Sequence, residues 1–478
     1  MSRRVYIALG ANLGDRAAAL TAAWQCLQRH PRINGVATSQ AFDSTPMYES
    51  NQPRFLNAVV CVDTTLPPME LLLSAKQIEA ELGRQASARN GPRQIDVDIV
   101  AFEDGARFSS PHSGHSGHSD RSDEQLGREM PLEVPHPRAC ERSFVRRPLQ
   151  ELLRSVYGLD DSAAAQRVDE LVGTAPADYS IEEESSMQTV LSLGSTVLMQ
   201  GGTPLIMGIV NCTPDSFSDG GLCLDRDAAV RHARQLLEAG ADILDIGGLS
   251  TRPGADFGSA QLERDRVLPV IESIRREHAT VPVSVDTFRP SVARAAFEAG
   301  ATLLNDVSGG TGHTWDTTEH ETMFQVAARC GAPLCVMHTR GSPQQMALNA
   351  HYDDVVTDVR TELQAHLDEA QREGVPAWNL IADVGIGFAK NARHNWQLCR
   401  ELEAAHPASF ASLFGPSRKR FLASALQDAG CGTDNAQRDL ATASLIGSLP
   451  FTPSIVRVHN VATTRAALVV RRMLRQLP

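Results

Sequence analysis

Short apolar runs that stop abruptly at a polar residue recur along the second half of the chain. The first, Leu205 to Val210, ends at Asn211 and passes into a loop rich in Thr, Pro, Asp, Ser and Gly. This pattern is typical of a buried strand that delivers a polar side chain to the rim of a sheet. Including the first, eight runs are strand candidates. The polar residues that end the other seven are Asp245, Asp286, Asn305, His338, Asp383, Ser417 with Arg418 and Lys419, and Arg457 with His459.

Each strand candidate is followed by a stretch with helical periodicity. The clearest are residues 227–239, 262–275, 291–299, 354–372 and 463–474. Strict alternation of strand and helix predicts parallel strands joined by right-handed crossovers. Eight such units in about 290 residues fit a (β/α)8 TIM barrel, and an open doubly wound sheet is disfavoured because no GxGxxG turn is present. The carboxyl ends of barrel strands form one rim, so we expect the polar residues to converge at one mouth.

These converging residues fall into two chemical sets. The first offers acceptors and donors for a flat, amide-like heterocycle, and the second offers a cation-rich pocket for a diphosphate and its metal. The alternative for any single Asp at a strand end is to cap the next helix. The first set is Asp245, Asp286, Asn305, Asp383 and Lys419. The second is Asn211, Arg252, Arg457 and His459.

The first part of the chain, from Arg3 to about Tyr157, mixes strand and helix signals differently. Residues 4–14, 36–46, 55–66 and 94–102 resemble strands, and the middle two are expected to pair antiparallel. Amphipathic spacing predicts helices around 20–27 and 71–82. The pattern predicts an α+β ferredoxin-like domain, with a mixed sheet and helices on one side.

Two carboxylates stand out in the last of these strands. Side chains alternate along a strand, so Asp96 and Asp98 should share one face while Ile95, Val97 and Ile99 enter the core. Paired carboxylates suit a hard divalent cation that also holds phosphate oxygens, although a solvated strand face is the open alternative. The nearby residues Arg84, Arg89 and Arg93 could clamp a polyphosphate. No GxxxxGK[ST] loop is present, which excludes a P-loop nucleotide site.

Composition narrows the function classes. The chain has 478 residues, of which 42% are hydrophobic and 21% charged, and no apolar run approaches the roughly 18 residues of a membrane span. A net charge of −12 argues against a nucleic-acid or membrane surface, so anionic substrates need local Arg and Lys clusters. The nine scattered cysteines indicate free thiols in a reducing compartment. A strand beginning at Val5 leaves no room for an export or transit peptide, so we expect a cytoplasmic protein.

Two segments interrupt the periodic pattern. An insertion from about Asp104 to Met130 contains His112, His115 and His118, which invite a metal interpretation. Its Ser/Gly-rich composition favours a disordered surface loop instead. Residues 158–186 are acidic and small, which predicts a solvated linker with a short helical piece near residues 163–171. The predicted domains are therefore residues 1–157 and 187–478, joined by this linker.

The first domain resembles the hydroxymethyldihydropterin pyrophosphokinases. The motifs that carry the resemblance are YIALGANLGD at residues 6–15, STP at 44–46, FLNAVV at 55–60, GPRQIDVDI at 91–99 and VPHPRACERSFV at 134–145. The resemblance implies ATP as a substrate and two Mg2+ ions on Asp96 and Asp98. One departure is Asn90, where the family usually has an aromatic residue.

The same resemblance implies roles for further residues. Arg84, Arg93 and His136 would contact the nucleotide or the transferring group. The pterin ring would lie between two aromatic side chains, with polar groups at its edge that fix its orientation. These pterin residues are Phe55 and Phe144 for the stacking, and Thr45, Pro46 and Asn57 for the edge.

The second domain, from about Leu191 onward, resembles the dihydropteroate synthases. The shared motifs are MGIVNCTPDSFSDGG at residues 207–221, STRPGA at 250–255, SVDT, NDVSGG, VMHTRGSPQQM, SRK and RVHNV. The resemblance implies that the first set of rim residues holds the pterin, and that Asn211 takes a Mg2+ on the diphosphate beside Arg252, Arg457 and His459. Thr251, Phe388 and Ser417 would line the p-aminobenzoate site, with Lys419 between the two pockets. A homodimer through the barrel is also implied.

This domain departs from the family pattern at three positions. Leu249 stands where the family commonly has Glu, Val384 where it has Pro, and Ala389 where it has Gly. None of the implied ligands is lost. The loop stiffness and the affinity for p-aminobenzoate are the properties that these changes put in question.

Together the two resemblances indicate a multifunctional transferase of folate biosynthesis. A kinase half would pyrophosphorylate 6-hydroxymethyl-7,8-dihydropterin with ATP, and the barrel would condense the pterin diphosphate with p-aminobenzoate to give 7,8-dihydropteroate. Two alternatives stay open from sequence. The barrel could be a pterin-dependent methyl transferase, or the N-terminal half could be a non-catalytic pterin-binding or assembly module.

Overall fold

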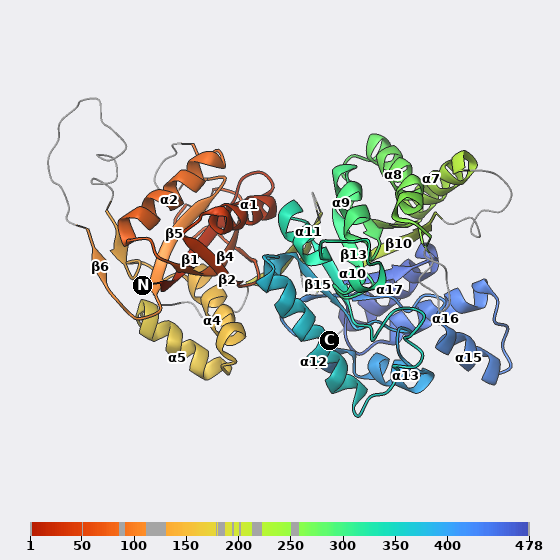
Figure 1. Ribbon diagram of the computed structural model, residues 1–478. Coiled ribbons are helices and arrows are strands. Elements are labelled where there is room, and N and C mark those ends of the chain that lie inside the picture. Colours follow the sequence, from red (N-terminus) through yellow and green to blue (C-terminus); the bar gives the residue numbers. More distant parts are fainter. Residues whose placement is uncertain are drawn as a thin grey trace. The chain divides into compact units, whose positions relative to one another are not determined.

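The computed structural model divides the chain into two compact units (Figure 1). The first contains residues 1–190 and 376–378, and the second contains residues 191–375 and 379–478. The residues that the structure describes are 2–49, 51–85, 91–110, 131–177, 179, 187–193, 196–199, 202–212, 222–249 and 258–476.

The first unit is built on a sheet whose long central strands are β1 (Arg3–Ala11) and β4 (Phe55–Thr64). The strand order is β5-β1-β4-β3-β8-β9, and β2 also pairs with β4. The pairs β1–β4, β1–β5, β2–β4, β3–β4 and β3–β8 are all antiparallel, so the prediction of a mixed sheet is wrong for them. The remaining strands are β2 (Ile33–Thr38), β3 (Phe42–Ser44), β5 (Asp96–Phe102), β8 (Gln188–Leu193) and β9 (Thr196–Met199), with a separate pair β6 (Phe108–Ser109) and β7 (Glu133–Val134).

Helices cover both faces of this sheet (Figure 1). On one side lie α1 (Arg16–Arg29) and α2 (Pro68–Glu81), and on the other α4 (Ser143–Tyr157) and α5 (Asp161–Val172). The prediction of helices on one side is therefore wrong. The reason is visible in β1 and β4, which are nearly continuous apolar runs, because strands buried on both faces lose their alternation.

The helix α5 also corrects the predicted linker. Asp160 caps its start, because its Oδ1 accepts a hydrogen bond from the Ala163 amide at 2.8 Å, as is typical of an N-cap. Its apolar side chains Ala164, Val168 and Leu171 are buried against α4 in the core of the unit. Spacing at i, i+4 and i+7 makes one apolar stripe even in an acidic segment. Residues 161–172 are thus part of the N-terminal unit and not solvated linker.

The second unit contains a closed barrel of eight parallel strands, as predicted. Each strand pairs with the next, and β17 returns to β10 through the register Leu205 with Ile455. The strands are β10 (Leu205–Asn211), β11 (Ile243–Gly247), β12 (Val283–Asp286), β13 (Leu303–Asp306), β14 (Leu334–Met337), β15 (Leu380–Asp383), β16 (Ala411–Phe414) and β17 (Ile455–Val458).

Helices follow the barrel strands and surround them (Figure 1). One end of the barrel interior is filled by apolar side chains, including Leu191 and Leu193 of β8 against Met207 and Ile455. The polar residues lie toward the carboxyl ends of the strands. The helices are α7 (Leu222–Glu238), α8 (Ala260–Glu277), α9 (Pro290–Glu298), α10 (Gly312–Trp315), α11 (Met323–Cys330), α12 (Val355–Arg372), α13 (Ala392–Arg400), α14 (Leu402–Ala405), α15 (Arg420–Asp428), α16 (Asn435–Ser448) and α17 (Val461–Gln476), with a 3-10 turn at Ala377–Asn379.

The described residues bear on two expectations from composition, which concern membrane spans and the state of the cysteines. No helix among them has both the length and the apolar content that crossing a membrane requires. The cysteines among them are free thiols, as predicted from their scattered spacing.

Candidate active sites

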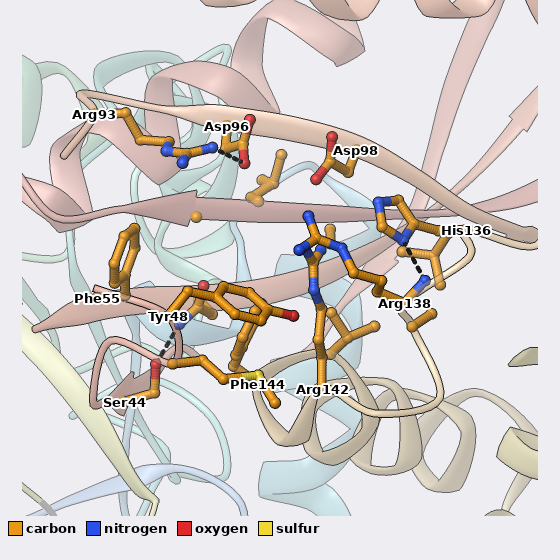
Figure 2. A pocket seen from close by; sticks show the side chains of 18 of the residues that line it. Ser44, Tyr48, Phe55, Arg93, Asp96, Asp98, His136, Arg138, Arg142 and Phe144 are labelled. Atoms are coloured by element: carbon orange, nitrogen blue, oxygen red, sulfur yellow. Dashed lines mark hydrogen bonds and ion pairs between the residues drawn. The ribbon is translucent and has the colours of Figure 1, made fainter. Parts of the chain in front are cut away.

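A cavity of about 480 Å3 opens in the N-terminal unit beside β5. Asp96 and Asp98 both line it, while the residues between and after them, Val97 and Ile99, are buried. Figure 2 shows the two carboxylates side by side on one strand. The predicted residues that line the cavity are Thr45, Phe55, Asn57, Arg84, Arg93, Asp96, Asp98, His136 and Phe144. Pro46 is half-buried and does not line it.

The two carboxylates have different surroundings. Asp96 forms an ion pair with Arg93 Nη1 at 2.7 Å (Figure 2) and another with Arg84 Nη1 at 2.6 Å. Burial opposes ionisation here, but the guanidinium charges of Arg93 and Arg84 hold the pKa of Asp96 below its usual value. Asp98 has a weaker cationic neighbour, Lys76 Nζ at 3.9 Å. A polyphosphate entering the cavity would therefore meet both carboxylates and three cations.

Aromatic and polar groups occupy the other side of the cavity. Phe55 comes from the start of β4, and Phe144 from the first turn of α4. Asn57 is buried and donates from Nδ2 to Ser44 Oγ at 2.8 Å (Figure 2). Gly10 is required beside it, because a Cβ at that position would lie 2.9 Å from Asn57 Oδ1. The strands thus fix a polar edge next to two rings.

Sequence reasoning missed several residues of this cavity. Lys76 of α2 is one of them, and Glu79 of the same helix is its partner but does not itself line the cavity. In sequence, a Lys and a Glu at i, i+3 look like ordinary surface charges. In the fold, Glu79 is buried, and its Oε1 accepts from Lys76 Nζ at 2.7 Å and from the Val97 amide at 2.8 Å. Glu79 therefore ties the helix to the strand that carries the aspartates.

A second missed group consists of Tyr48, Arg138 and Arg142, all of which line the cavity (Figure 2). The Arg138 guanidinium lies 4.8 Å from the Tyr48 ring centroid, and that of Arg142 lies 5.4 Å from the Phe144 ring. Both arginines lie in the motif at residues 134–145, so their position in the sequence was a usable signal. Burial lowers the pKa of the neighbouring His136, which favours a neutral imidazole.

The barrel mouth brings together residues from four strands around Arg457. The Arg457 guanidinium donates from Nε to Asp245 Oδ2 and from Nη2 to Asp286 Oδ2, each at 2.6 Å. Asn305 Nδ2 lies 3.4 Å from Asp245 Oδ2. These contacts place the predicted heterocycle residues Asp245, Asp286 and Asn305 in one cluster. Arg457, predicted for the diphosphate side, lies within that cluster.

Asp286 is an unusual acid in this cluster. Its Oδ1 is buried with no hydrogen-bond partner among the described residues. Burial, the largest cause, and the charge of Asp245 raise the pKa of Asp286 to about 7, although Arg457 acts in the opposite direction. An unpartnered buried oxygen on a group that titrates near neutrality indicates a ligand site, because buried polar atoms are normally satisfied.

Asp383 reaches the mouth from the end of β15. Its Oδ1 accepts from the Gly385 amide at 2.7 Å, and burial raises its pKa. Gly385 has φ +69°, and a Cβ there would lie 1.9 Å from the His338 carbonyl oxygen. Only glycine fits this turn, which holds the carboxylate at the rim.

A second group at the mouth comes from the ends of β16 and β17 and from the loop after β15. Ser417 Oγ lies 2.9 Å from His459 Nδ1 and accepts from the His459 amide at 3.1 Å. Lys419 Nζ lies 4.0 Å from the centroid of the Phe388 ring. The predicted arylamine residues Phe388 and Ser417 are therefore each in contact with a residue predicted for the pterin or the anion.

Some predicted residues cannot be placed in this way. Asn211, the last residue of β10, is half-buried. Arg89, Asn90, His112, His115, His118, Thr251 and Arg252 lie outside the described residues.

Leu249, the departure from Glu, has a clear environment. It packs on an apolar cluster formed by Phe288, Val307 and Met337, to which Phe388 also belongs. An apolar side chain suits this position because its neighbours are apolar.

Metal binding has to be judged from the donors. In the part of the chain that the structure describes, no three His, Cys, Asp or Glu side chains gather as a metal site. The pair Asp96 and Asp98 nevertheless fits Mg2+, which usually takes one or two carboxylates together with substrate phosphates and water.

Comparison with known proteins was made for both units. Residues 6–154 match the family model of 7,8-dihydro-6-hydroxymethylpterin-pyrophosphokinase, and residues 207–459 match that of the pterin binding enzymes. The chain is 38% identical to the folate synthesis bifunctional protein, mitochondrial, of Arabidopsis thaliana, over 99% of this chain and 83% of that protein.

Two solved structures extend the comparison. A Xanthomonas albilineans dihydropteroate synthase with 4-aminobenzoic acid is 36% identical, with a TM-score of 0.53, and is matched over 61% of this chain and 100% of that chain. The Plasmodium falciparum HPPK-DHPS with pteroate has a TM-score of 0.77 over 100% of this chain and 98% of that chain. At 20% identity the second similarity concerns the fold alone.

Proposed function

We propose residue roles for the two reactions of this chain, which belongs to the family of bifunctional folate synthesis proteins that join a hydroxymethyldihydropterin pyrophosphokinase to a dihydropteroate synthase. It is a transferase with both activities. The prediction from sequence is confirmed, and neither alternative, a methyl transferase barrel or an inactive N-terminal half, is supported. One observation carries the assignment of roles in the barrel. Asp286 has a buried Oδ1 with no hydrogen-bond partner among the described residues, and it lies at the same mouth as Arg457 and the other carboxylates.

In the kinase unit, the dihydropterin stacks between Phe55 and Phe144, and Asn57 with Thr45 fixes its edge, whereas Pro46, which does not line the cavity, keeps only the role implied by resemblance. Asp96 and Asp98 would hold two Mg2+ ions, which would supply positive charge to the phosphate oxygens of ATP. Arg84 and Arg93, which pair with Asp96, also reach the phosphates, and His136 contacts the nucleotide or the transferring group. The hydroxymethyl oxygen then attacks the β-phosphorus, and AMP leaves.

In the barrel, Asp245, Asp286 and Asn305 accept and donate hydrogen bonds at the heterocycle, together with Asp383 and Lys419. Asp286 Oδ1 is the acceptor for a ring N–H. Asp245 also eases positive charge that develops on the pterin methylene as the diphosphate departs.

The diphosphate and the arylamine occupy the other part of the mouth. Asn211 would hold one Mg2+, which would supply positive charge to the diphosphate. Arg457 and His459 would stabilise the leaving anion, as would Arg252, which lies outside the described residues. Phe388, Ser417 and Thr251 line the p-aminobenzoate site. Because Ser417 bonds His459 and Phe388 stacks on Lys419, each arylamine contact is coupled to a group of the first substrate.

One polypeptide supplied with ATP, Mg2+, 6-hydroxymethyl-7,8-dihydropterin and p-aminobenzoate should make 7,8-dihydropteroate. Each step can be followed separately, the first by AMP release and the second from added pterin diphosphate. A sulfonamide, an analogue of p-aminobenzoate, should compete with it in the second step. Absence of competition would contradict the arylamine assignment.

The raised pKa of Asp286 predicts a pH dependence of the second step. An ionised carboxylate accepts hydrogen bonds from the ring, whereas the protonated acid offers fewer acceptor positions. Because the pKa is about 7, the acid form gains population as pH falls below 7, so kcat/KM for pterin diphosphate should fall there and level off above pH 8. The check is the pH profile between 5.5 and 9, and Asp286→Asn, although less active, should lose this inflection. An unchanged inflection in the variant would assign it to another group.

A homodimer through the barrel remains a proposal, and an exposed apolar stripe supports it. Its residues lie on α16 and α17, which pack against each other. An apolar patch of this kind on a soluble protein commonly marks an interface. The stripe consists of Leu440, Val469, Val470, Met473 and Leu474.

Val470 is 60% exposed, so its replacement by Asp should leave the fold intact and weaken the dimer at least about tenfold, since a charge would be desolvated in the interface. Light scattering during size exclusion measures this. Leu348→Asp is the matched control, because Leu348 is 75% exposed and lies outside the stripe. A wild-type chain that is monomeric at all concentrations would contradict the proposal.

The remaining predictions on partners and location stay predictions. We propose that the substrates are small molecules and that the chain binds neither nucleic acid nor a membrane, in line with its net charge of −12. The cytoplasmic location also stays a prediction, and the Arabidopsis relative is named as mitochondrial.

A further inference from the structure

A chain of hydrogen-bonded side chains lies beside the barrel mouth and has no role in the assignments above. Lys390 Nζ lies 2.9 Å from His338 Nδ1, and His338 Nε2 lies 3.0 Å from Glu362 Oε2. Arg340 Nε donates to the same carboxylate at 3.0 Å. Since a lysine ammonium can only donate, His338 accepts at Nδ1 and carries its proton on Nε2 toward Glu362. His338 is fully buried, whereas Lys390, Arg340 and Glu362 are half-buried, so this chain runs from the interior to the surface.

Lys390 ends the loop that connects β15 to α13. Besides His338, its ammonium group donates to the Phe388 carbonyl oxygen at 3.0 Å. It therefore connects the backbone of this loop to the end of β14, where His338 lies directly after Met337. The loop begins directly after Asp383 of β15, so the contact of Lys390 with His338 links this loop to the end of the neighbouring strand β14.

The residue between Phe388 and Lys390 has an unfavourable backbone conformation. Ala389 has φ +47°, in the left-handed region that costs an alanine energy but a glycine almost none. Its carbonyl oxygen accepts from the Tyr352 hydroxyl at 3.0 Å. Hydrogen bonds thus hold the carbonyls on both sides of the strained peptide, one from Lys390 and one from Tyr352.

The conformation of this peptide sets the position of the Phe388 ring. That ring contacts the Lys419 ammonium group at 4.0 Å and packs on the apolar cluster that includes Leu249. If the backbone at Ala389 relaxed to negative φ, Phe388 would lose this placement. The glycines of this loop, Gly385 and Gly387, lie before the strained position, which is occupied by Ala389.

We propose that Lys390 is a positioning residue for the arylamine: by holding the Phe388 carbonyl and His338, it keeps Ala389 left-handed and the Phe388 ring in place against Lys419. The inference rests on the proposed function, in which Phe388 lines the p-aminobenzoate site. Lys390 acts on the Phe388 ring through the backbone of this loop. Its charge also interacts with the pterin residues Asp383 and Lys419, with opposite signs. Its removal should therefore affect the second substrate of the barrel and leave the first nearly unchanged.

Lys390 is half-buried, and partial removal of its amine from water costs free energy, which supports a functional reason for its position. Burial lowers the pKa of Lys390 to about 7, with Asp383 and Glu362 favouring the charged form and Arg340 and Lys419 opposing it. A neutral His338, whose pKa burial lowers to about 3, can accept a hydrogen bond from Lys390 at any physiological pH.

The test compares Lys390→Met with Lys390→Met combined with Ala389→Gly in the full chain. The single variant should raise KM for p-aminobenzoate about tenfold, equivalent to about 1.4 kcal/mol, with KM for pterin diphosphate changed less than twofold. Adding Ala389→Gly should restore most of that loss, because glycine adopts positive φ without support. Arg393→Met, at an exposed position in the first turn of α13, is the matched control.

Two further variants keep the result decisive. Tyr352→Phe removes the other hydrogen bond to this loop from a half-buried position, and should give a smaller rise in the same KM that Ala389→Gly also reverses. It replaces Lys390→Met if that variant does not fold. Phe388→Ala tests the proposed function itself. If Phe388→Ala leaves KM for p-aminobenzoate unchanged, the arylamine assignment is wrong. Suppose instead that Phe388→Ala raises that KM. The present inference alone is then overturned if the Lys390 or Tyr352 variant changes both KM values equally, or if Ala389→Gly does not rescue that variant.

Discussion

Replacement of Asp96 by alanine is expected to abolish the first reaction, with a loss of at least about 10³-fold in kcat/KM for pterin pyrophosphorylation. In the proposed role this carboxylate would hold Mg2+, and it pairs with Arg84 and Arg93. Its loss would remove a metal ligand and the ion pair of Arg93, while Arg84 would keep Glu79 as a partner. AMP release at saturating ATP measures the effect. The second reaction, started from added pterin diphosphate, should keep its wild-type rate, because no barrel residue is changed.

The matched control for this prediction is Asp63→Ala. Asp63 lies on β4 and pairs with Arg4 at 2.9 Å, and it does not line the cavity. Its removal deletes an ion pair of the same type from the same sheet, so any general effect on the fold would appear in both variants. Full kinase activity in Asp96→Ala would show that the metal assignment is wrong.

The second large effect is expected at Arg457. Its replacement by methionine leaves Asp245 and Asp286 without their shared cation, and Asp245 is fully buried. Breaking a buried ion pair on one side costs about 3–5 kcal/mol, so the barrel should unfold at a lower temperature. The leaving diphosphate would also lose a proposed partner, and kcat/KM for the second reaction should fall about 10²- to 10³-fold.

These two consequences can be separated in one further variant. Arg457→Met combined with Asp245→Asn removes the fully buried one of the two unpaired carboxylates and should recover part of the stability, measured by thermal unfolding, without recovering activity. The kinase reaction of the same polypeptide is the internal control. Recovery of activity in the double variant would mean that Arg457 only neutralises the aspartates and does not serve the anion.

The barrel and its mouth could be predicted from the sequence because each strand has a recognisable pattern. A buried parallel strand is a continuous apolar run, and a polar residue directly after it has to lie at the rim. Asp245, Asp286 and Asn305 follow this rule although they are far apart in the chain, and the structure brings them into one cluster. Parallel closure then needs no information beyond the alternation of strand and helix.

Other features depend on tertiary contacts that leave weak traces in sequence. The acidic composition around α5 made its apolar stripe hard to recognise, because the stripe is short and begins with the small side chains Ala164 and Val168. Glu79 looked like a surface charge and becomes buried only because β5 lies beside α2. Arg457 lies beside Asp245 and Asp286 because β17 closes the barrel. No local sequence pattern encodes which strand closes it.

The closing strand has a consequence for incomplete copies of this protein. Arg457 lies on β17, the last strand, yet its partners Asp245 and Asp286 lie on the second and third strands of the barrel. A chain that stops before β17 therefore lacks both the strand that pairs with β10 and the cation at the centre of the mouth. Every residue proposed for the kinase lies before residue 145. Premature termination would thus be expected to silence dihydropteroate formation first, while a surviving fragment could still consume ATP.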